Sequence, residues 1–592
     1  MLGPPLAAGM WLADARVISV ELLPATLPLE VGDTSRVTCV PKNGKGTPLT
    51  NTCQFLSTDT SVARLTAKAA QTVRVTGRKT GTARVIAWVK QYAKVRDTTL
   101  VTVTTADTVT PPVPPDTTKP PPPDTTTPPD TTTPPPVACS PSATTICPGD
   151  GWQAKVTAAP TGTVFTIGAG VHRGQTVVAK TSQRFMAQPG AVMSGAKLLT
   201  GWVPSGATWY VGGQSQEFGH TTGECISGTA CLYPEDVYRD DVLLKRELSL
   251  AAVGPGEMYF DYAADRIYVG DNPAGHKLEA AATEYAFLGS PDGAGAGVVI
   301  DGLTIEKYAN QGQYGAVGRS NTQRGWIIRN AIIRWNHGAA IRTGAIQVLN
   351  SHIHHNGQIG MVGGGDATTL ISGNEVDHNN TAGYRPEWEA GGIKFGGGYF
   401  SGMVARKNHI HDNDGIGLWF DGYGDQFHFD SNTVVNNTWD GIKVEISYSG
   451  TVIGNVVTNN GFANPHSSEG DGIMVYSAGG SGLEISGNTL SGNKHAIMLF
   501  AADRGSGPAG PLVTQNVNVH DNTITLSGSQ RTGAVRYNGS TGLWTTDNNH
   551  FERNTYHLQS AVAAPFLWAN NTAHTDAQWK AAGNDETGTF NR

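Results

Sequence analysis

The 592-residue sequence lacks any run of about 20 apolar residues, so we expect no segment that spans a membrane. It also lacks an excess of basic residues. Its 42 Lys and Arg against 49 Asp and Glu give a net charge of −7, which leaves no electrostatic footprint for nucleic acid. Charged residues make up only 15%, whereas 74 glycines are typical of a turn-rich chain. We therefore expect no nucleic-acid partner.

The sequence has no long segment with a helical apolar period, and its short β-branched runs are bounded by Gly, Asn and Asp. One short phrase recurs as GNEV, KNHI, SNTV, GNVV, GNTL and DNTI. Its asparagines lie at intervals of 34, 24, 23, 33 and 34 residues: Asn374, Asn408, Asn432, Asn455, Asn488 and Asn522. Such a period predicts the coils of an all-β solenoid, a right-handed parallel β-helix. We expect the asparagines to stack as a hydrogen-bonded ladder.

The six cysteines contain no CxxC motif, which argues against a zinc site. They form three close pairs, which predict disulfides in an oxidising compartment: Cys39 with Cys53, Cys139 with Cys147, and Cys225 with Cys231. Residues 1–15 lack a basic and a fully apolar region, and we interpret them as a truncated remnant of a signal peptide. These features favour a secreted or cell-surface bacterial protein.

Composition divides the chain into four regions. After residues 1–15, short alternating strands in residues 16–105 resemble a bacterial Ig-like domain, which implies either a spacer or a contact with the cell surface or a polysaccharide. Residues 106–137 repeat PPDTTT-like units, which stay extended and form a linker. Residues 138–592 carry the coils, and about 201–284 break the coil rhythm. We expect a small inserted β domain there.

Three coils are lengthened by segments of roughly ten residues. These are TAGYRPEWEA from Thr381, GFANPHSSEG from Gly461 and AADRGSGPAG from Ala501. Insertions into a solenoid become loops, and loops on one face bound a binding cleft. We expect the functional site beside these loops.

Aligning GLWFD with GIKVEI places Asp421 and Glu445 at the same position of adjacent coils. An inward column is predicted to consist of Ile341, Ile393, Leu418, Ile442, Ile473 and Ile497, beside an outward column of Arg342, Lys394, Trp419, Lys443, Met474 and Met498. The two carboxylates then stand side by side at strand spacing, about 5–6 Å apart. That separation is what a retaining glycosidase needs.

GLWFD, followed by a coil that ends in VEIS, resembles the β-helix β-xylosidases of glycoside hydrolase family 120. The resemblance covers residues from about Cys139 to the C-terminus, and its specific motifs lie between Gly415 and Tyr448. It implies that Asp421 is the nucleophile and Glu445 the general acid and base, and that an inserted β-sandwich-like domain interrupts the helix. The segment ISYSG after Glu445 differs from the asparagine- and histidine-bearing stretch of that family, so the sugar stays open.

Several other residues are candidates for substrate binding. Trp419 is expected to be an exposed platform for a sugar ring; the alternative is a solvated stripe in which Lys394 and Lys443 stabilise the indole by cation–π contacts. Arg342 and Tyr476 share the same face. In the first lengthened loop, Glu389 could orient substrate or assist protonation. The aromatic residues that could form the walls of the sugar subsites are Trp388, Tyr423, Tyr384 and Tyr399.

A second set of residues is rich in histidine: His352, His354, His355, His378, His409 and His411, with Asp377 and Asp412 among them. Their spacing follows the repeat rather than a metal motif, so we interpret them as a structural ladder, although such a column could hold a divalent metal. For the enzyme we expect no metal and no cofactor.

Two other functions remain open. In a polysaccharide lyase, a Lys or Arg would act as base on a uronate polymer, with either a divalent cation such as calcium or basic side chains neutralising the carboxylate. Lys394, Arg342 or Lys443 could act as this base, but the negative charges of Asp421 and Glu445 would repel a uronate. In a non-catalytic carbohydrate-binding adhesin, the stacked carboxylates would have no explanation. Fold alone cannot decide among these functions.

Overall fold

The computed structural model describes residues 16–23, 26–30, 34–44, 49–66, 70–92, 94–104, 139–289, 295–319, 323–466, 469–559 and 562–592. The expected signal remnant at 1–15 lies outside the described residues, and so do 106–137, the expected linker. The chain forms two compact units, residues 1–129 and residues 130–592.

The N-terminal unit consists of two four-stranded sheets. One contains, in order, β1 (Ser19–Leu23), β3 (Thr34–Lys42), β6 (Thr72–Gly77) and β5 (Ala63–Thr66); the other contains β2 (Thr26–Glu30), β8 (Arg96–Thr104), β7 (Gly81–Val89) and β4 (Cys53–Ser57), with η1 (Lys90–Tyr92) between β7 and β8. Alternate apolar residues such as Val37, Val75 and Val85 form one buried core. The Cys39–Cys53 disulfide joins β3 to β4, and hence one sheet to the other. Its resemblance to an Ig-like domain stays a prediction.

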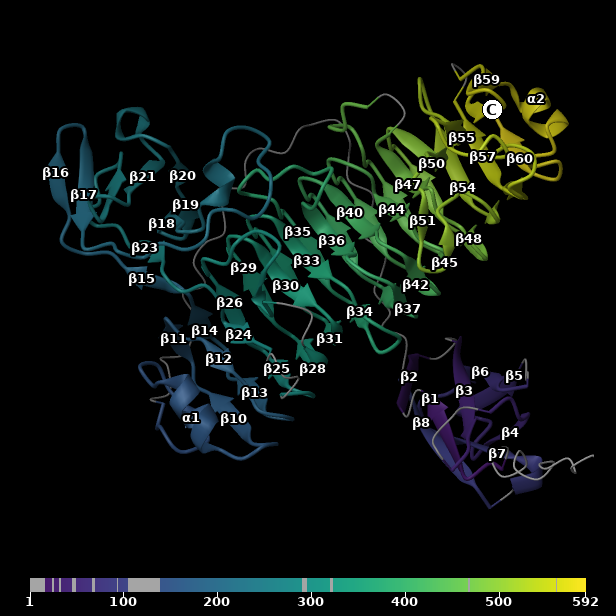
Figure 1. Ribbon diagram of the computed structural model, residues 1–592, viewed down its shortest axis with the longest axis horizontal. Coiled ribbons are helices and arrows are strands. Elements are labelled where there is room, and N and C mark those ends of the chain that lie inside the picture. The colour runs from purple at the N-terminus through teal and green to yellow at the C-terminus, as the bar shows by residue number, and fades with distance from the viewer. Residues whose placement is uncertain are drawn as a thin grey trace, which may run out of the picture. The chain divides into compact units, whose positions relative to one another are not determined.

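The second unit is a solenoid with three long sheets, which we name sheets I, II and III (Figure 1). Within the described residues each has 13 strands, parallel except for the last pair of sheet III. Sheet I contains β9 (Thr145–Ile146), β10 (Val164–Ile167), β13 (Arg184–Ala187), β25 (Val299–Asp301), β28 (Arg324–Arg329), β31 (Ala345–Leu349), β34 (Leu370–Ser372), β38 (Val404–Arg406), β42 (Phe427–Asp430), β45 (Ser449–Ile453), β48 (Gly482–Ser486), β53 (Val517–His520) and β56 (His550–Glu552).

The other two sheets follow the same coils. Sheet II contains β11 (Gly170–Arg173), β14 (Ala191–Ser194), β26 (Thr304–Glu306), β29 (Ile332–Arg334), β32 (His352–His354), β35 (Glu375–Asp377), β39 (His409–His411), β43 (Thr433–Val435), β46 (Val456–Thr458), β49 (Thr489–Ser491), β54 (Thr523–Leu526), β57 (Thr555–Leu558) and β60 (Thr589–Asn591). Sheet III contains β12 (Val177–Val178), β24 (Phe287–Leu288), β27 (Gly315–Val317), β30 (Ala339–Thr343), β33 (Ile359–Gly363), β36 (Gly391–Phe395), β40 (Ile416–Phe420), β44 (Ile442–Glu445), β47 (Asp471–Tyr476), β50 (His495–Ala501), β55 (Thr532–Arg536), β58 (Phe566–Trp568) and β59 (Thr572–His574).

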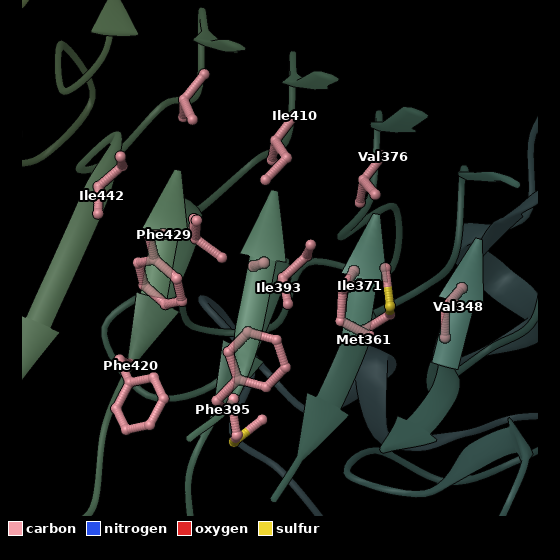
Figure 2. Close-up of a cluster of buried hydrophobic side chains, with 14 of the residues drawn as sticks. Val348, Met361, Ile371, Val376, Ile393, Phe395, Ile410, Phe420, Phe429 and Ile442 are labelled. Atoms are coloured by element: carbon pink, nitrogen blue, oxygen red, sulfur yellow. The ribbon is translucent and has the colours of Figure 1, made fainter. Parts of the chain in front are cut away.

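Each coil runs from sheet I through sheet II to sheet III, and the three strands bury one apolar face together. Figure 2 shows these inward side chains stacking from coil to coil, with Ile371, Val376 and Ile393 supplied by sheets I, II and III. The core is continuous along the solenoid because every strand alternates inward and outward residues. The predicted parallel β-helix is therefore confirmed.

Two asparagine ladders hold the corners of the coils. The first, between sheets I and II, contains the six predicted residues and continues through Asn554 to Asp585. In it the Nδ2 of Asn432 donates to the Ala405 carbonyl at 3.0 Å and to Asn455 Oδ1 at 3.0 Å. The second, between sheets II and III, consists of Asn336, Asn356, Asn379, Asn413, Asn437, Asn460 and Asn493. Stacked amides satisfy backbone groups that the corners would otherwise leave buried and unpaired.

Two short helices cover the ends of the core. In α1 (Trp152–Ala158), Trp152 and Val156 are buried against the first coils, and in α2 (Asp576–Ala581), Trp579 packs on Phe566 with ring centroids 4.7 Å apart. Among the described residues, no helix is long and apolar enough to cross a membrane.

Two small sheets interrupt the coils between β14 and β24 and have a core of their own, with Val237, Phe260 and Ile267 at its centre. One contains β15 (Ala196–Leu198), β23 (Leu278–Ala281), β18 (Val237–Arg239) and β19 (Val242–Leu243); the other contains β16 (Val203–Ser205), β17 (Thr208–Gly212), β22 (Arg266–Val269), β21 (Glu257–Asp261) and β20 (Lys245–Arg246), with η2 (Ala230–Leu232) and η3 (Leu250–Ala252) in the connections. The inserted sheets project beside the solenoid (Figure 1). They begin at Ala196, slightly before position 201, where the sequence predicts the break in the coil rhythm.

All three predicted disulfides are present. Two further pairs of very short strands lie at the edge of the coils, β37 (Phe400–Ser401) with β41 (Gly424–Asp425) and β51 (Ser506–Gly507) with β52 (Gly510–Pro511).

Candidate active site on the outer face of sheet III

The three lengthened coils all flank sheet III. Residues 381–390 and 461–470 lie between a sheet II strand and the sheet III strand that follows, and residues 501–510 lie after β50. The register along the outer face is Arg342, Val362, Lys394, Trp419, Lys443, Met474 and Met498. The predicted outward column is thus present, and it contains one further residue, Val362, from a coil that the prediction omits. Because Val362 separates Arg342 from Lys394, these two cations are not direct neighbours.

The ammonium of Lys394 is the common neighbour of several groups at this face. Its Nζ lies 2.9 Å from Asp421 Oδ2, donates to the Trp388 carbonyl at 2.6 Å and sits 3.5 Å from the centre of the Trp419 ring. Asp421 follows β40 directly and is half-buried. The electrostatic field of Lys394 also acts on the carboxyls of Glu389 and Glu445. Lys394 thus pairs directly with Asp421 and lowers the pKa of two further carboxyls through its field.

Glu445, at the end of β44, is held as an anion. It is only 6% exposed, and it pairs with Lys443 at 3.2 Å and with Arg504 at 2.5 Å. Burial alone would raise the pKa of Glu445, but Lys443 and Arg504 outweigh burial and hold that pKa below its usual range. The same contact raises the pKa of Lys443 despite its burial. A carboxylate in this environment keeps its charge at neutral pH.

Glu389 has the opposite environment. It lies in the 381–390 loop, half-buried, and burial raises its pKa, while Lys394 and Arg342 offset only part of that effect. A carboxyl group that remains protonated nearer neutral pH can act as a general acid. The outer face of sheet III thus carries carboxyls whose pKa values are shifted in opposite directions.

The inserted domain positions the loop that carries Glu389. Cys225 forms a β-bridge with Tyr384, and Cys231, Tyr384 and Ala390 form one buried cluster. Space around Gly223 is tight: a Cβ there would lie 2.5 Å from Tyr384 and 3.3 Å from Glu389 Oε1. The Cys225–Cys231 disulfide closes the segment that makes these contacts. The order of the Glu389 loop therefore depends on the inserted domain.

The expectation of an exposed Trp419 is wrong, because its side chain is only 3% exposed. Trp439 packs against it, and the Nζ atoms of Lys394 and Lys443 lie 3.5 and 5.0 Å from its ring centre. The cation–π contacts of the alternative are present, but the stripe is not solvated, because Lys443 is only 7% exposed as well. Met474 and Met498 are buried as well, in a cluster with Phe500, so the face is apolar and closed toward the C-terminus.

Exposed aromatic side chains nevertheless occur on several loops that lead into or out of sheet III strands. Among the described side chains, the strongly exposed aromatics are Trp388 at 55%, Tyr399 at 49%, Phe462 at 65% and Tyr537 at 75%. Trp388 and Phe462 precede sheet III strands, and Tyr399 and Tyr537 follow them. Exposed rings of this kind are suited to stacking on sugars.

The remaining predicted residues occupy different places. Tyr384 is fully buried and belongs to the support of the loop rather than to a binding surface. Arg342 donates to the Gln313 carbonyl at 2.6 Å, and burial lowers its pKa. Tyr476 lies beside the cations, with Lys443 5.4 Å from its ring centre, and Tyr423 is half-buried against Gly507 of the third insertion.

Two buried carboxyls lie at the starts of neighbouring sheet III strands. Asp440 accepts hydrogen bonds from the backbone of Gly470 and Asp471, and both oxygens of Asp471 lack a hydrogen-bond partner among the described residues. Burial raises the pKa of each, and for Asp471 the neighbouring Asp440 raises it further.

Two features are missing from the sequence-based prediction. One is the role of Arg504. The sequence could have indicated it, because Arg504 is the only basic residue of the AADRGSGPAG insertion. The second ladder had a plain signal, because an asparagine follows each of Asn374, Asn408, Asn432, Asn455 and Asn488 after five residues.

Comparison with known proteins supports the fold. A family model described as "Right handed beta helix region" matches residues 314–480. No curated protein matches the chain. Similar solved structures include the A-module of the mannuronan C-5 epimerase AlgE4 from Azotobacter vinelandii (13% identity, 66% of this chain and 94% of that one, TM-score 0.41) and a glycoside hydrolase (11% identity, 71% and 91%, TM-score 0.33).

A fragment of the S-layer protein SbsC, domains 5–6, is also similar, at 16% identity and a TM-score of 0.14. It matches 15% of this chain, and the chain spans 44% of its length. The solved structures thus include a carbohydrate epimerase and a glycoside hydrolase among those similar to this chain, and they assign no reaction to it.

Proposed function

We propose that the chain is a secreted or surface-exposed carbohydrate-active enzyme that hydrolyses a glycosidic bond at the outer face of sheet III. The observation that supports this proposal is that Asp421 and Glu445 lie at the ends of neighbouring strands of sheet III, with Asp421 paired to Lys394, while Glu389 in the adjoining loop has a raised pKa and Glu445 a lowered one. Carboxyls whose environments separate their pKa values are typical of acid–base catalysis. The exposed aromatics beside the site are suited to carbohydrate.

In the proposed reaction Glu389 is the general acid. It gives its proton to the glycosidic oxygen while the bond between that oxygen and the anomeric carbon breaks, and an Asp421 oxygen forms a bond to the anomeric carbon. Water then attacks the same carbon, the ionised Glu389 takes a proton from the water, and the bond to Asp421 breaks. The anomeric configuration is retained.

Glu445 has a different role here from the acid–base role that the resemblance to family 120 implies. Its lowered pKa makes it a poor proton donor, since Lys443 and Arg504 stabilise its charged form. We assign to Glu445 the positioning of Lys443 and Arg504, which could bond substrate hydroxyls. A β-xyloside is the first substrate to test because of the resemblance in GLWFD and VEIS.

The decisive experiment compares Asp421→Asn, Glu389→Gln and Glu445→Gln on aryl glycosides with good and poor leaving groups. Asp421→Asn should lose turnover on both. Glu389→Gln should keep much of its activity on the good leaving group, lose roughly 10²–10⁴-fold on the poor one, and be accelerated by azide. If Glu445→Gln shows this pattern instead, Glu445 is the acid.

Product analysis separates the competing functions. Hydrolysis gives saturated reducing ends, whereas a lyase gives a UV-absorbing double bond. The structure offers little support for a lysine base, because Lys443 has a raised pKa and Lys394 makes an ion pair with Asp421 that requires its ammonium form. An adhesin would bind the same oligosaccharides and release no product.

A further inference from the structure

The outer face of sheet II carries a second polar array in the same coils. β32, β35 and β39 are neighbours in register, so that His352, Glu375 and His409 form one row and His354, Asp377 and His411 the next. A third row follows at the corner, where His355, His378 and Asp412 have left-handed backbone conformations with φ near 50°. All nine positions carry histidine or a carboxylate, the side chains that bind transition metals.

The array ends sharply on both sides. The coil before it places Ile332, Arg334 and Trp335 at the three equivalent positions, and the coil after it places Thr433, Val435 and Asn436. If these side chains served only to stack from coil to coil, nothing would require histidines and carboxylates in three coils and other residues in the coils on either side. The pattern therefore indicates a local site rather than a general feature of the repeat.

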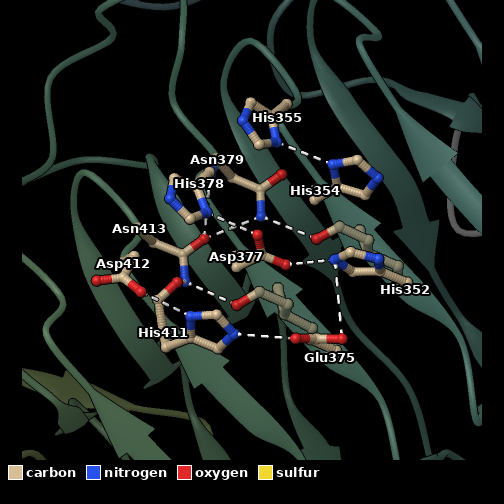
Figure 3. Close-up of polar contacts among 12 residues, drawn as sticks. His352, His354, His355, Glu375, Asp377, His378, Asn379, His411, Asp412 and Asn413 are labelled. Carbon is tan, nitrogen blue, oxygen red and sulfur yellow. Dashed lines mark hydrogen bonds and ion pairs between the residues drawn. The ribbon is translucent and has the colours of Figure 1, made fainter. Parts of the chain in front are cut away.

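Donor atoms converge at the centre of the array (Figure 3). His352 Nε2 lies 2.6 Å from Asp377 Oδ1 and 3.9 Å from Glu375 Oε2, and Glu375 Oε1 lies 3.3 Å from His411 Nε2. Ligand atoms of a tetrahedral zinc site are about 3.3 Å apart, given bonds of about 2.0 Å. The present separations bracket that value, so small side-chain rotations suffice to admit an ion.

Outer contacts orient the donors. His411 Nδ1 lies 2.7 Å from Asp412 Oδ2, and a proton held on Nδ1 by this contact leaves the lone pair of Nε2 directed at Glu375. The other oxygen of Asp377 contacts His378 Nδ1 at 2.6 Å. A carboxylate behind a ligating histidine is the usual outer arrangement of metal sites.

We propose that His352, Glu375 and Asp377, whose ligand atoms lie within 4.8 Å of one another, bind one divalent transition-metal ion of the zinc type, with His411, 3.3 Å from Glu375, as a further donor. His409 and His355 complete the two adjoining triads, with ligand atoms within 4.8 Å of one another, and provide alternative donors at its edges. Within the described part of the chain, the ion pairs of Glu375, Asp377 and Asp412 are all with histidines, so no lysine or arginine there occupies the place of the ion. The site is independent of the proposed glycosidase chemistry.

The test uses the full chain without a polyhistidine tag, stripped with EDTA and titrated with ZnCl₂ by calorimetry and with Co²⁺ by visible absorption. We expect one ion per chain and the absorption of tetrahedral cobalt. Glu375→Gln, at an exposed position, and Asp377→Asn should each weaken zinc binding at least 10-fold, and Asp412→Asn should weaken it by roughly 10–100-fold.

The matched control is His550→Ala, an exposed histidine of sheet I outside the array, which should leave zinc affinity unchanged. Circular dichroism and the unfolding midpoint verify that each variant is folded. Equal zinc affinity in the wild type and in Glu375→Gln/Asp377→Asn would overturn the proposal. Tighter binding of Ca²⁺ than of Zn²⁺ would overturn it as well, because calcium prefers oxygen ligands alone.

Discussion

The same coils present two polar faces, and the two faces differ in the partners of their carboxylates. On sheet III, Asp421 and Glu445 meet lysine and arginine, which hold permanent charges. On sheet II, Glu375 and Asp377 meet histidines, whose ring nitrogens are metal ligands. A β-helix fixes the same distance between coils on both faces. The side chain that neighbours a carboxylate therefore decides whether that carboxylate is suited to acid–base catalysis or to metal binding.

On sheet III, the largest effect is expected when an ion-pair partner of Glu445 is removed. Lys443→Met leaves Glu445 buried with Arg504 alone, and we expect the free energy of unfolding to fall by about 3–5 kcal/mol in urea denaturation. Lys443→Met/Glu445→Leu should recover much of this loss, because the buried carboxylate is removed as well and the side chain of Arg504, which remains, is 34% exposed. Lys245→Met, which removes an exposed lysine that also contacts two carboxylates, is the control and should have little effect. Equal losses in both single variants would contradict the assignment.

A substitution in the second ladder tests whether both faces depend on one scaffold. Asn437→Ala removes donors to Ile410 and Asn460 and the acceptor that Asn413 uses, and we expect a loss of about 2–3 kcal/mol in the free energy of unfolding. Because this corner joins sheet II to sheet III, both zinc affinity and turnover should decrease. Asn591→Ala, at an exposed position, supplies the control. Loss of only one of the two activities would show that the faces are independent.

Removing the disulfide of the inserted domain should affect one face only. Cys225→Ser/Cys231→Ser opens a short loop, and we expect about 2 kcal/mol of destabilisation. The Glu389 loop would lose its support, and kcat should fall roughly 10-fold to 100-fold. Zinc affinity, measured on the same sample, should not change. If kcat stays at the wild-type value, the inserted domain does not position Glu389.

The smallest expected effect concerns pH. The pKa of Asp471 is raised in the folded protein, so the stability linked to it is present below its ordinary pKa of 3.8 and is lost as pH rises through the raised value. The pKa of Glu445 is lowered, so its contribution is present above 4.5 and is lost as pH falls through the lowered value. Asp471→Asn should therefore be more stable than the wild type at neutral pH.

Urea unfolding at a series of pH values measures this difference. The gain from Asp471→Asn should shrink as the pH falls toward the ordinary pKa of aspartate, since the wild-type carboxyl is then neutral as well. An amide at position 471 could donate to the neighbouring Asp440. A variant whose advantage grows on acidification would contradict the sign of the shift.

The repeat makes much of this fold predictable from sequence. Inward and outward columns follow from the alternation of a strand, so the period alone pairs Leu418 with Ile442 and places the carboxylates beside them on adjacent coils. The second ladder obeys the same period. Local pairing of cysteines is equally informative, because short loops leave few partners.

Features that the repeat does not encode cannot be predicted in this way. The path of the 501–510 loop brings Arg504 to Glu445, and the packing of Trp439 covers Trp419. Both depend on loop conformation and on side-chain packing outside the period. The opposite pKa shifts of Glu389 and Glu445 follow from burial and from these contacts, so the division of roles between the carboxyls is set by tertiary structure rather than by the repeat.

The closed ends of the solenoid bear on how copies of the chain meet one another. An open coil would present unpaired backbone groups to which a second molecule could add, as in a growing fibre. Here the first ladder terminates on Asp585, whose oxygens accept from Asn554, Tyr556 and Trp579, and α2 lies over the last apolar layer. Deleting one internal coil should therefore shorten the particle without making it polymerise.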